Sequence, residues 1–294
     1  FDNAEVLPSI VIFRNRVPSL DAQVLFTVGG TLNSPVTTET VLLRDLSADQ
    51  KWKLPFKDRA SQRSSGFRIK DLFKIRRGIA TGANDFFILE RKVARELGLP
   101  EIALKPVLPK SRVLNEAVIQ RDSDGYPKVE PKLCVIDCSL TETEIARKYR
   151  RLARYLSTAK DRNILKRNLI RNRTPWYKQE VRAPAPFLCT YMGRGRKGLP
   201  PIHFYWNKSD AIATNTYLML YPNPSLAKIL EENEKRGEEL LDMLQKAART
   251  TVLEQSRLHA GGLRKIEPKE LGNVTLLDVP AWVPQSDSSL FLEI

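Results

Sequence analysis

The side chains best suited to chemistry in this chain gather in a short stretch of its first third. Residues 72–89 read LFKIRRGIATGANDFFIL, in which two apolar runs flank a polar turn. Apolar runs around a turn with glycine and asparagine predict strand, turn, strand. Guanidinium, hydroxyl and amide groups bind phosphates and base edges, and this stretch offers Arg76, Arg77, Thr81 and Asn84. The alternative is an ordinary hairpin with a solvated tip.

Another hairpin is predicted from strands at 187–191 and 202–206. The loop between them opens with MGRGRKG and carries Arg194, Arg196 and Lys197. Because glycine lets the backbone approach a ligand closely, these cations are further candidates for contacts near the bases. A solvated loop has the same composition, so that alternative stays open.

A strongly basic segment, Thr141 to Arg173, lies between the two predicted hairpins. Thr141 and Glu144 have the spacing of a capping box, and apolar residues then recur every three or four positions, which predicts a helix. The segment has 11 Lys and Arg against three acidic residues. Such an excess repels itself unless an anion neutralises it, although many basic runs are only solvated helix faces. The candidates for phosphate contacts are Arg150, Arg154, Arg167 and Arg171.

The next segment, residues 173–178, interleaves aromatic and basic side chains in the order RTPWYK. Aromatic rings between cations are typical of surfaces on which bases stack, so Trp176 is a candidate for stacking. The alternative is that the ring anchors a hydrophobic core.

The composition indicates a globular protein with a polyanionic partner. Hydrophobic residues make up 42% and charged residues 28% of the 294 residues, and the net charge is +14 with a pI near 9.7. A pI this high points to nucleic acid more often than to an anionic membrane. Because the sequence has no apolar run of about 20 residues and no secretory signal, we expect no membrane partner and a cytoplasmic location.

The cysteines and histidines argue against a metal site. Three cysteines in a long chain suit free thiols in a reducing compartment. Cys134 and Cys138 are close in sequence, but His203 and His259 are far from them, so the spacing of a zinc site is missing. We expect no metal.

The remaining pattern predicts a mixed α+β fold. A short helix is expected at 92–97, and a long helical region from Asn223 to Leu258 that Gly237 breaks in two. Besides the strands of the two predicted hairpins, short apolar runs predict strands at 9–13, 24–28, 133–136, 211–221 and 274–277. The first two of these, 9–13 and 24–28, are apolar enough to need a sheet covered on both faces.

No catalytic constellation is present in the sequence. It contains no GxxxxGK[ST] phosphate-binding loop, no nucleophile elbow and no glycine fingerprint that opens a βαβ unit. The carboxylates are scattered, and none is singled out as an acid–base pair. Composition alone predicts a basic α+β domain that binds nucleic acid.

Seven segments in order carry a resemblance to a known family. They are FDNAEVLPSIVIFRN, LFKIRRGIATGANDFFIL, KPVLPKSRVL, RTPWYKQE, FLCTYMGRGRK, NTYLMLYP and GGLRKIEPKEL. Together they resemble the C-terminal part of the N6-adenine DNA methyltransferases of restriction–modification systems. The similarity is to the branch in which the catalytic domain precedes the target-recognition domain, as in the Taq enzyme, and it covers nearly the whole chain.

The resemblance implies that the Asn-Pro-Pro-Tyr catalytic motif and the S-adenosylmethionine site lie upstream. Phe1 falls where the family has an aromatic residue that stacks on the flipped adenine. Asn223-Pro224-Ser225 is the nearest match to the catalytic motif, but it lacks the second proline and the aromatic residue and follows the recognition segments. Because the first residue is Phe1 and not Met, we expect a piece of a longer protein, without catalytic residues or a cofactor site of its own.

We therefore expect the last strands of a methyltransferase sheet at 1–45, and a mixed α+β target-recognition domain with twisted β-hairpins and long helices at 46–294. Its partners would be double-stranded DNA and an upstream catalytic domain of the same polypeptide, to which the enzyme activity would belong. Other interpretations stay open: a specificity subunit without a methyltransferase of its own, an RNA-binding or RNA-modifying module, and a basic scaffold that binds no nucleic acid.

Overall fold

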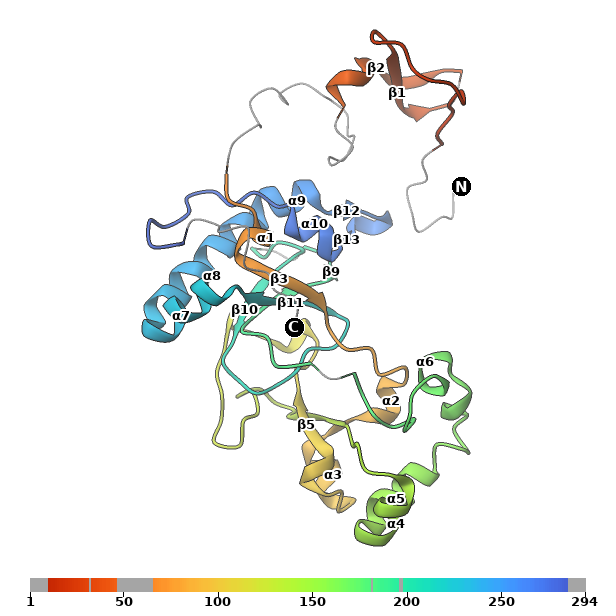
Figure 1. Cartoon of the computed structure of the whole chain (residues 1–294), viewed down its shortest axis with the longest axis vertical. Helices are drawn as coiled ribbons and strands as arrows, with labels where there is room; N and C mark the ends of the chain where they lie inside the picture. The colour runs from red at the N-terminus through yellow and green to blue at the C-terminus, as the bar shows by residue number, and fades with distance from the viewer. Residues whose placement is uncertain (1–9, 32, 47–65, 181, 196–197, 285–294) are drawn as a thin grey trace. The chain divides into compact units, whose positions relative to one another are not determined.

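The computed structural model describes residues 10–31, 33–46, 66–180, 182–195 and 198–284. The chain separates into two compact units, Val6–Gly66 and the remainder, and each is described by itself. The predicted mixed α+β class is confirmed, because several sheets alternate with helices along the chain (Figure 1).

The smaller unit is built around one β-hairpin, in which β1 (Gln23–Gly30) pairs antiparallel with β2 (Pro35–Leu42). The predicted strand at 24–28 is therefore confirmed. The strand predicted at 9–13 is wrong for residues 10–13, which form no strand and are exposed. Among the described residues of this unit, the apolar side chains of the hairpin are also largely open to solvent, so the sheet is not covered on both faces as expected; examples are Leu25, Val28 and Val36.

The larger unit contains a five-stranded sheet in the order β3-β11-β8-β10-β6. Its neighbours are antiparallel except β6, which runs parallel to β10. The predicted hairpin at 187–191 and 202–206 is confirmed as the pair β8 and β10. The strands are β3 (Phe73–Arg77), β11 (Tyr217–Pro222), β8 (Phe187–Thr190), β10 (Phe204–Asn207) and β6 (Val118–Ile119).

One face of this sheet packs against helices and forms the first core, which includes Phe73, Leu218, Leu240 and Leu244. The opposite face carries a smaller core around Tyr217. Figure 1 shows most of these helices gathered on one side of β3 and β11. They are α1 (Ile69–Leu72), α7 (Pro224–Glu232), α8 (Glu234–Arg249), α9 (Thr251–Gln255) and α10 (Pro268–Gly272).

The predicted helix break at Gly237 is wrong. The break lies at Asn233, whose side chain accepts a hydrogen bond from the backbone N–H of Lys235 and so caps α8. Gly237 lies inside α8, and the residue there is glycine because a Cβ would overlap the ring of Trp206. Here the glycine serves close packing and does not end the helix.

A second core surrounds the three-stranded antiparallel sheet β4-β7-β5. Its strands are β4 (Ile88–Glu90), β7 (Leu133–Ile136) and β5 (Leu104–Val107). Its helices are α2 (Asn84–Phe87), α3 (Arg91–Glu96), α4 (Glu142–Lys148), α5 (Arg150–Ser157) and α6 (Asn168–Arg171). The predicted strand at 133–136 and the helix at 92–97 are confirmed to within one residue.

The predicted hairpin at 72–89 is wrong, because its two strands belong to different sheets. β3 pairs with β11, whereas β4 pairs with β7 in the second core. Between them, Phe86 and Phe87 are helical and bury both rings in the second core. The burial of two adjacent aromatic residues on one short helix decides against the extended conformation that their type favours.

The capping box of Thr141 and Glu144 is present at the start of α4. The helix it opens is interrupted at Tyr149, where φ is −135°, so α4 and α5 are two short helices and not one rod. The predicted strands near the C-terminal side are also shorter than expected. Residues 211–216 lie outside β11, and 274–277 contribute a single bridge between Thr275 and Arg68.

Candidate nucleic-acid interface

The turn that follows β3 uses its own polar groups internally. Thr81 is fully buried, and its hydroxyl donates to Oδ1 of Asn84 (2.6 Å) and accepts from the backbone N–H of Ala83 (3.1 Å). Both predicted side chains therefore stabilise the start of α2, and the Thr81 hydroxyl is shielded from a ligand.

Three arginines from the segment 160–173 hold this turn in place, and one of them, Arg173, donates to the carbonyl of Thr81. Asp85 receives hydrogen bonds from Arg162 (3.1 Å) and Arg167 (3.2 Å), and Arg167 also donates to the carbonyl of Gly82. Burial alone would raise the pKa of the Asp85 carboxyl, but the bonds and charges of these guanidinium groups lower it below its ordinary value. Arg167 is thus engaged within the protein.

The remaining basic candidates of this segment are exposed. Arg150 and Arg154 lie on α5 and Arg171 ends α6, and in the described part of the chain none of them forms an ion pair. Trp176, in contrast, packs against Phe86 and Phe87, and its Nε1–H donates to Glu142 (3.0 Å). These contacts place the Trp176 ring at the second core, which agrees with the alternative left open for it.

Arg76 and Arg77 point to opposite faces of the five-stranded sheet. They pair with Met219 and Leu218 of β11, which belong to the cores on its two faces. Arg77 is exposed, and its guanidinium carbon lies 4.1 Å from the centre of the Tyr191 ring. A planar guanidinium stacked on an aromatic ring keeps its N–H donors in the plane free for a ligand.

Tyr191 joins Arg77 to the small sheet β12-β13-β9, whose strands are β12 (Arg257–Leu258), β13 (Arg264–Lys265) and β9 (Met192–Gly193). The Tyr191 hydroxyl donates to Glu267 (2.6 Å), and the Lys265 ammonium lies 5.1 Å from the same ring. Arg194 follows β9, and its Nε–H donates to the carbonyl of Gly261 (3.1 Å).

We call this group the basic ledge; it consists of Arg77, Arg194, Arg257, Arg264 and Lys265. Arg257 and Lys265 are paired with acidic residues of α10 and its N-cap. The predicted set contains only Arg77 and Arg194 of the ledge. The signal for the others is local, namely a Gly261-Gly262 turn flanked by cations. Arg196, Lys197 and Phe1 lie outside the described residues.

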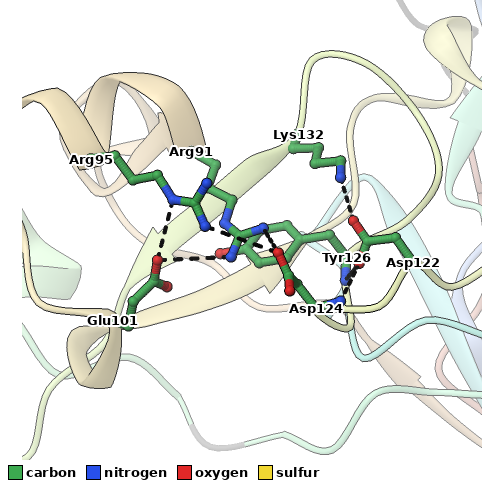
Figure 2. Close-up of polar contacts among 7 residues, drawn as sticks. All are labelled: Arg91, Arg95, Glu101, Asp122, Asp124, Tyr126 and Lys132. Carbon is green, nitrogen blue, oxygen red and sulfur yellow. Dashed lines mark hydrogen bonds and ion pairs between the residues drawn. The ribbon is translucent and has the colours of Figure 1, made fainter.

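A polar cluster absent from the predicted set fixes the turn 122–125 to α3 (Figure 2). The Arg91 guanidinium lies 4.2 Å from the Tyr126 ring and bonds Asp124 at 2.6 Å. Burial raises the pKa of Tyr126 to about 12, and its hydroxyl has no hydrogen-bond partner among the described atoms. The ion pairs around this centre are completed by Arg95, Glu101, Asp122 and Lys132.

Across the described ranges there is no group of three or more His, Cys, Asp or Glu side chains placed to hold a metal ion. Cys134, Cys138 and Cys189 are all buried free thiols, and burial raises the pKa of Cys189 well above its ordinary value. Within the same ranges, no helix has the length and apolar character needed to cross a membrane.

Comparison with known proteins identifies the family to which the chain belongs. Residues 51–293 match the family model of the type II methyltransferase M.Eco57I, C-terminal domain. Type II methyltransferase M.XamI of Xanthomonas campestris pv. amaranthicola is 29% identical over 273 residues, which is 92% of this chain and 48% of that protein. M.AccI of Acinetobacter calcoaceticus is 24% identical over 249 residues, or 83% and 43%. The chain thus spans about half the length of these relatives.

Among solved structures, the type IIG restriction endonuclease BpuSI matches with a TM-score of 0.44 and 14% identity, covering 77% of this chain and 25% of that one. The family match covers most of the sequence, and the two methyltransferases align with nearly all of it. The resemblance to the C-terminal part of restriction–modification methyltransferases is therefore confirmed, and the chain belongs to the family of the M.Eco57I C-terminal domain.

Proposed function

We propose that this chain recognises the DNA target of a site-specific adenine-N6 DNA methyltransferase in a restriction–modification system. The match of residues 51–293 to the C-terminal domain of a type II methyltransferase carries the proposal. An enzyme that modifies a base has to extrude it from the duplex, and a separate surface has to hold the backbone and read the neighbouring pairs. A net charge of +14 suits that surface.

The exposed arginines support a division of labour. Arg150, Arg154 and Arg171 lie on short helices of the second core, without ion pairs in the described residues, and suit phosphate contacts. Such contacts position a protein on DNA without reading sequence. Arg77 at the end of β3, and the rest of the basic ledge on and beside the small sheet β12-β13-β9, suit contacts to base edges.

Arg77 is the strongest candidate for reading a base. Its guanidinium is held on the Tyr191 ring, and the ring is fixed by the hydrogen bond to Glu267. A donor group that is already oriented loses less entropy when it binds. An arginine with two parallel N–H donors matches O6 and N7 of guanine, which is the commonest specific contact in the major groove.

Arg77→Ala is expected to reduce the preference for the cognate site over random duplex by about 5- to 150-fold, the equivalent of 1–3 kcal/mol for a bidentate base contact. Binding to random DNA should change far less. Arg76→Ala is the matched control, because this neighbour lies on the opposite face of the sheet. Competition binding measures both. Equal losses on every sequence would show that Arg77 is a clamp and not a reader.

The proposal assigns the catalytic domain and the S-adenosylmethionine site to the other half of the parent protein, since the relatives are about twice as long as the aligned part. The 294-residue chain is therefore expected to bind duplex DNA but not S-adenosylmethionine. Calorimetry with the cofactor measures this directly. Stoichiometric cofactor binding in the micromolar range would contradict the division into halves.

Selection from a pool of random duplexes tests the proposal as a whole. The expected result is enrichment of one short sequence motif, with weak binding to RNA duplexes and single strands, because RNA readers use loops and 2′-hydroxyls. Equal affinity for every nucleic acid, or no salt-dependent binding, would overturn it. With DNA as its partner, the protein is expected in the cytoplasm.

A further inference from the structure

An open groove of about 410 Å³ lies beside the β8–β10 hairpin. One wall is the segment 111–117, which precedes β6, and another is the end of α8. Residues 192–194 and 199–201 of the connection between β8 and β10 line the same space. The groove therefore brings together three segments that are far apart in sequence.

Three arginines from these three segments line the groove: Arg112, Arg194 and Arg249. All three are exposed, and in the described part of the chain none of them forms an ion pair. Among the described residues, Arg194 and Arg249 donate only to backbone carbonyls, those of Gly261 and Gly198. Glu116 is the single carboxylate among the described residues of the lining. Like charges collected in one place repel each other, so this arrangement favours an anionic ligand.

The neutral groups of the groove match a sugar–phosphate ligand better than a free anion. Gln245 and Asn115 offer amide groups, and Thr190 adds a hydroxyl to the lining. Side chains of these types, together with arginine, make most of the contacts that proteins form with phosphate oxygens and sugars of DNA. Other lining residues, such as Leu199, are apolar and carry no charge that would repel the DNA backbone.

The walls of the groove are held by contacts from both sides. The backbone N–H of Trp206 in β10 donates to the carbonyl of Ala117 (2.8 Å), and the side-chain amide of Gln245 donates to the carbonyl of Phe204 (2.6 Å). A site whose side chains are already ordered in the free protein has a smaller conformational entropy cost when the ligand binds.

We propose that this groove holds the sugar–phosphate backbone of one strand of duplex DNA, with Arg112 and Arg249 on phosphates. The inference rests on the proposed function and adds residues that it does not assign. Arg194 decides for a DNA strand over a free nucleotide, because it lines the groove and also lies three residues beyond Tyr191, the residue against whose ring Arg77 is held. A strand in the groove thus continues toward the base-reading arginine.

Arg112→Gln and Arg249→Gln, each in the full 294-residue chain, test the groove. Each lost phosphate contact is expected to reduce the log–log salt dependence of binding by about 0.9. Affinity should fall by the same factor on cognate and random duplexes, so that their ratio is unchanged. Lys92→Gln is the control, because Lys92 is exposed on α3 and is not part of the groove lining. It should have a smaller effect than either arginine variant.

The outcomes separate this inference from the proposed function. Specific DNA binding with unchanged affinity and salt dependence in both arginine variants overturns the groove and leaves the proposed function standing. A lower cognate-to-random ratio in either variant also overturns it, because the contact then reads sequence. Tighter binding of a deoxynucleoside monophosphate than of a duplex, competed at the groove, shows a small-molecule site instead. No DNA binding by the unmodified chain overturns both proposals.

Discussion

Gly78→Ala is expected to destabilise the larger unit by about 3 kcal/mol, the upper part of the range for overpacking a dense interior. Gly78 follows β3, and a Cβ at this position would overlap the carbonyl group of Thr214 and lie 2.6 Å from the carbonyl oxygen of Ala213. Both neighbours are backbone atoms. They cannot move away without breaking the hydrogen bonds that Ile79 makes with Ala213 and Asn215.

Urea denaturation measures this effect, with Gly195→Ala as the matched control. Gly195 lies in the connection between β8 and β10, where an added Cβ would meet only ordinary contacts at 3.6 Å and beyond. The urea midpoint of Gly195→Ala should stay close to that of the unmodified chain. Equal midpoints for both variants would show that the backbone around Gly78 rearranges freely, and would remove the close approach as a constraint.

Arg173→Met is expected to cost about 3 kcal/mol and to loosen the turn after β3. The Arg173 guanidinium donates to the carbonyls of Ala80 and Thr81 and to Oε1 of Gln179. Hydrogen bonds to a charged group contribute about 1.5–3 kcal/mol, and carbonyls left buried without a donor add a further cost. Methionine keeps much of the side-chain volume, so the change isolates the lost donors.

Arg171→Met provides the comparison, because Arg171 is exposed and in the described residues bonds no partner through its guanidinium. Its unfolding midpoint should be nearly unchanged. Hydrogen exchange gives a second measurement, in which the amides of residues 79–87 should lose protection in Arg173→Met alone. Full protection in that variant would contradict the role assigned to Arg173.

Features determined by neighbours in sequence were predictable. The capping box of Thr141 and Glu144 satisfies backbone donors within one helical turn, and the strand at 133–136 is a compact apolar run. The β8–β10 hairpin also followed from its pattern, since its strands pair across a single connection. For the capping box and the hairpin the decisive contacts lie within the segment that carries the signal, whereas the partners of the strand at 133–136 are the distant strands β4 and β5.

Features determined by distant partners were not predictable. β3 pairs with β11, which lies about 140 residues later, so nothing near residues 72–89 reveals that the hairpin does not form. Gly237 resembles a helix breaker until the Trp206 ring is seen against it. Tertiary packing overrides local propensity at such positions.

The candidate site shows the same limit. Residue type singled out Arg77, but not that it stacks on Tyr191 or that Arg76 lies on the other face. Arg167 and Arg171 were equivalent in sequence and both are exposed, yet Arg167 binds Asp85 and Arg171 forms no ion pair among the described residues. A count of charges cannot separate an arginine that holds a turn from one that is available to a ligand.

The small sheet β12-β13-β9 has a consequence for evolvability. Its strands contain two residues each, and Met192 and Leu258 are nearly half exposed, so these strands contribute little to the cores of the larger unit. Substitutions at the exposed positions of its strands, such as Met192 and Leu258, therefore leave the stability of the larger unit almost intact, as is usual at surface positions. Gly193 of β9 is an exception, because a Cβ there would overlap the carbonyl oxygen of Pro201. If the ledge reads DNA as proposed, a lineage can acquire a new target sequence at the exposed positions without losing its fold, and a library randomised there is the direct route to variants with altered sites.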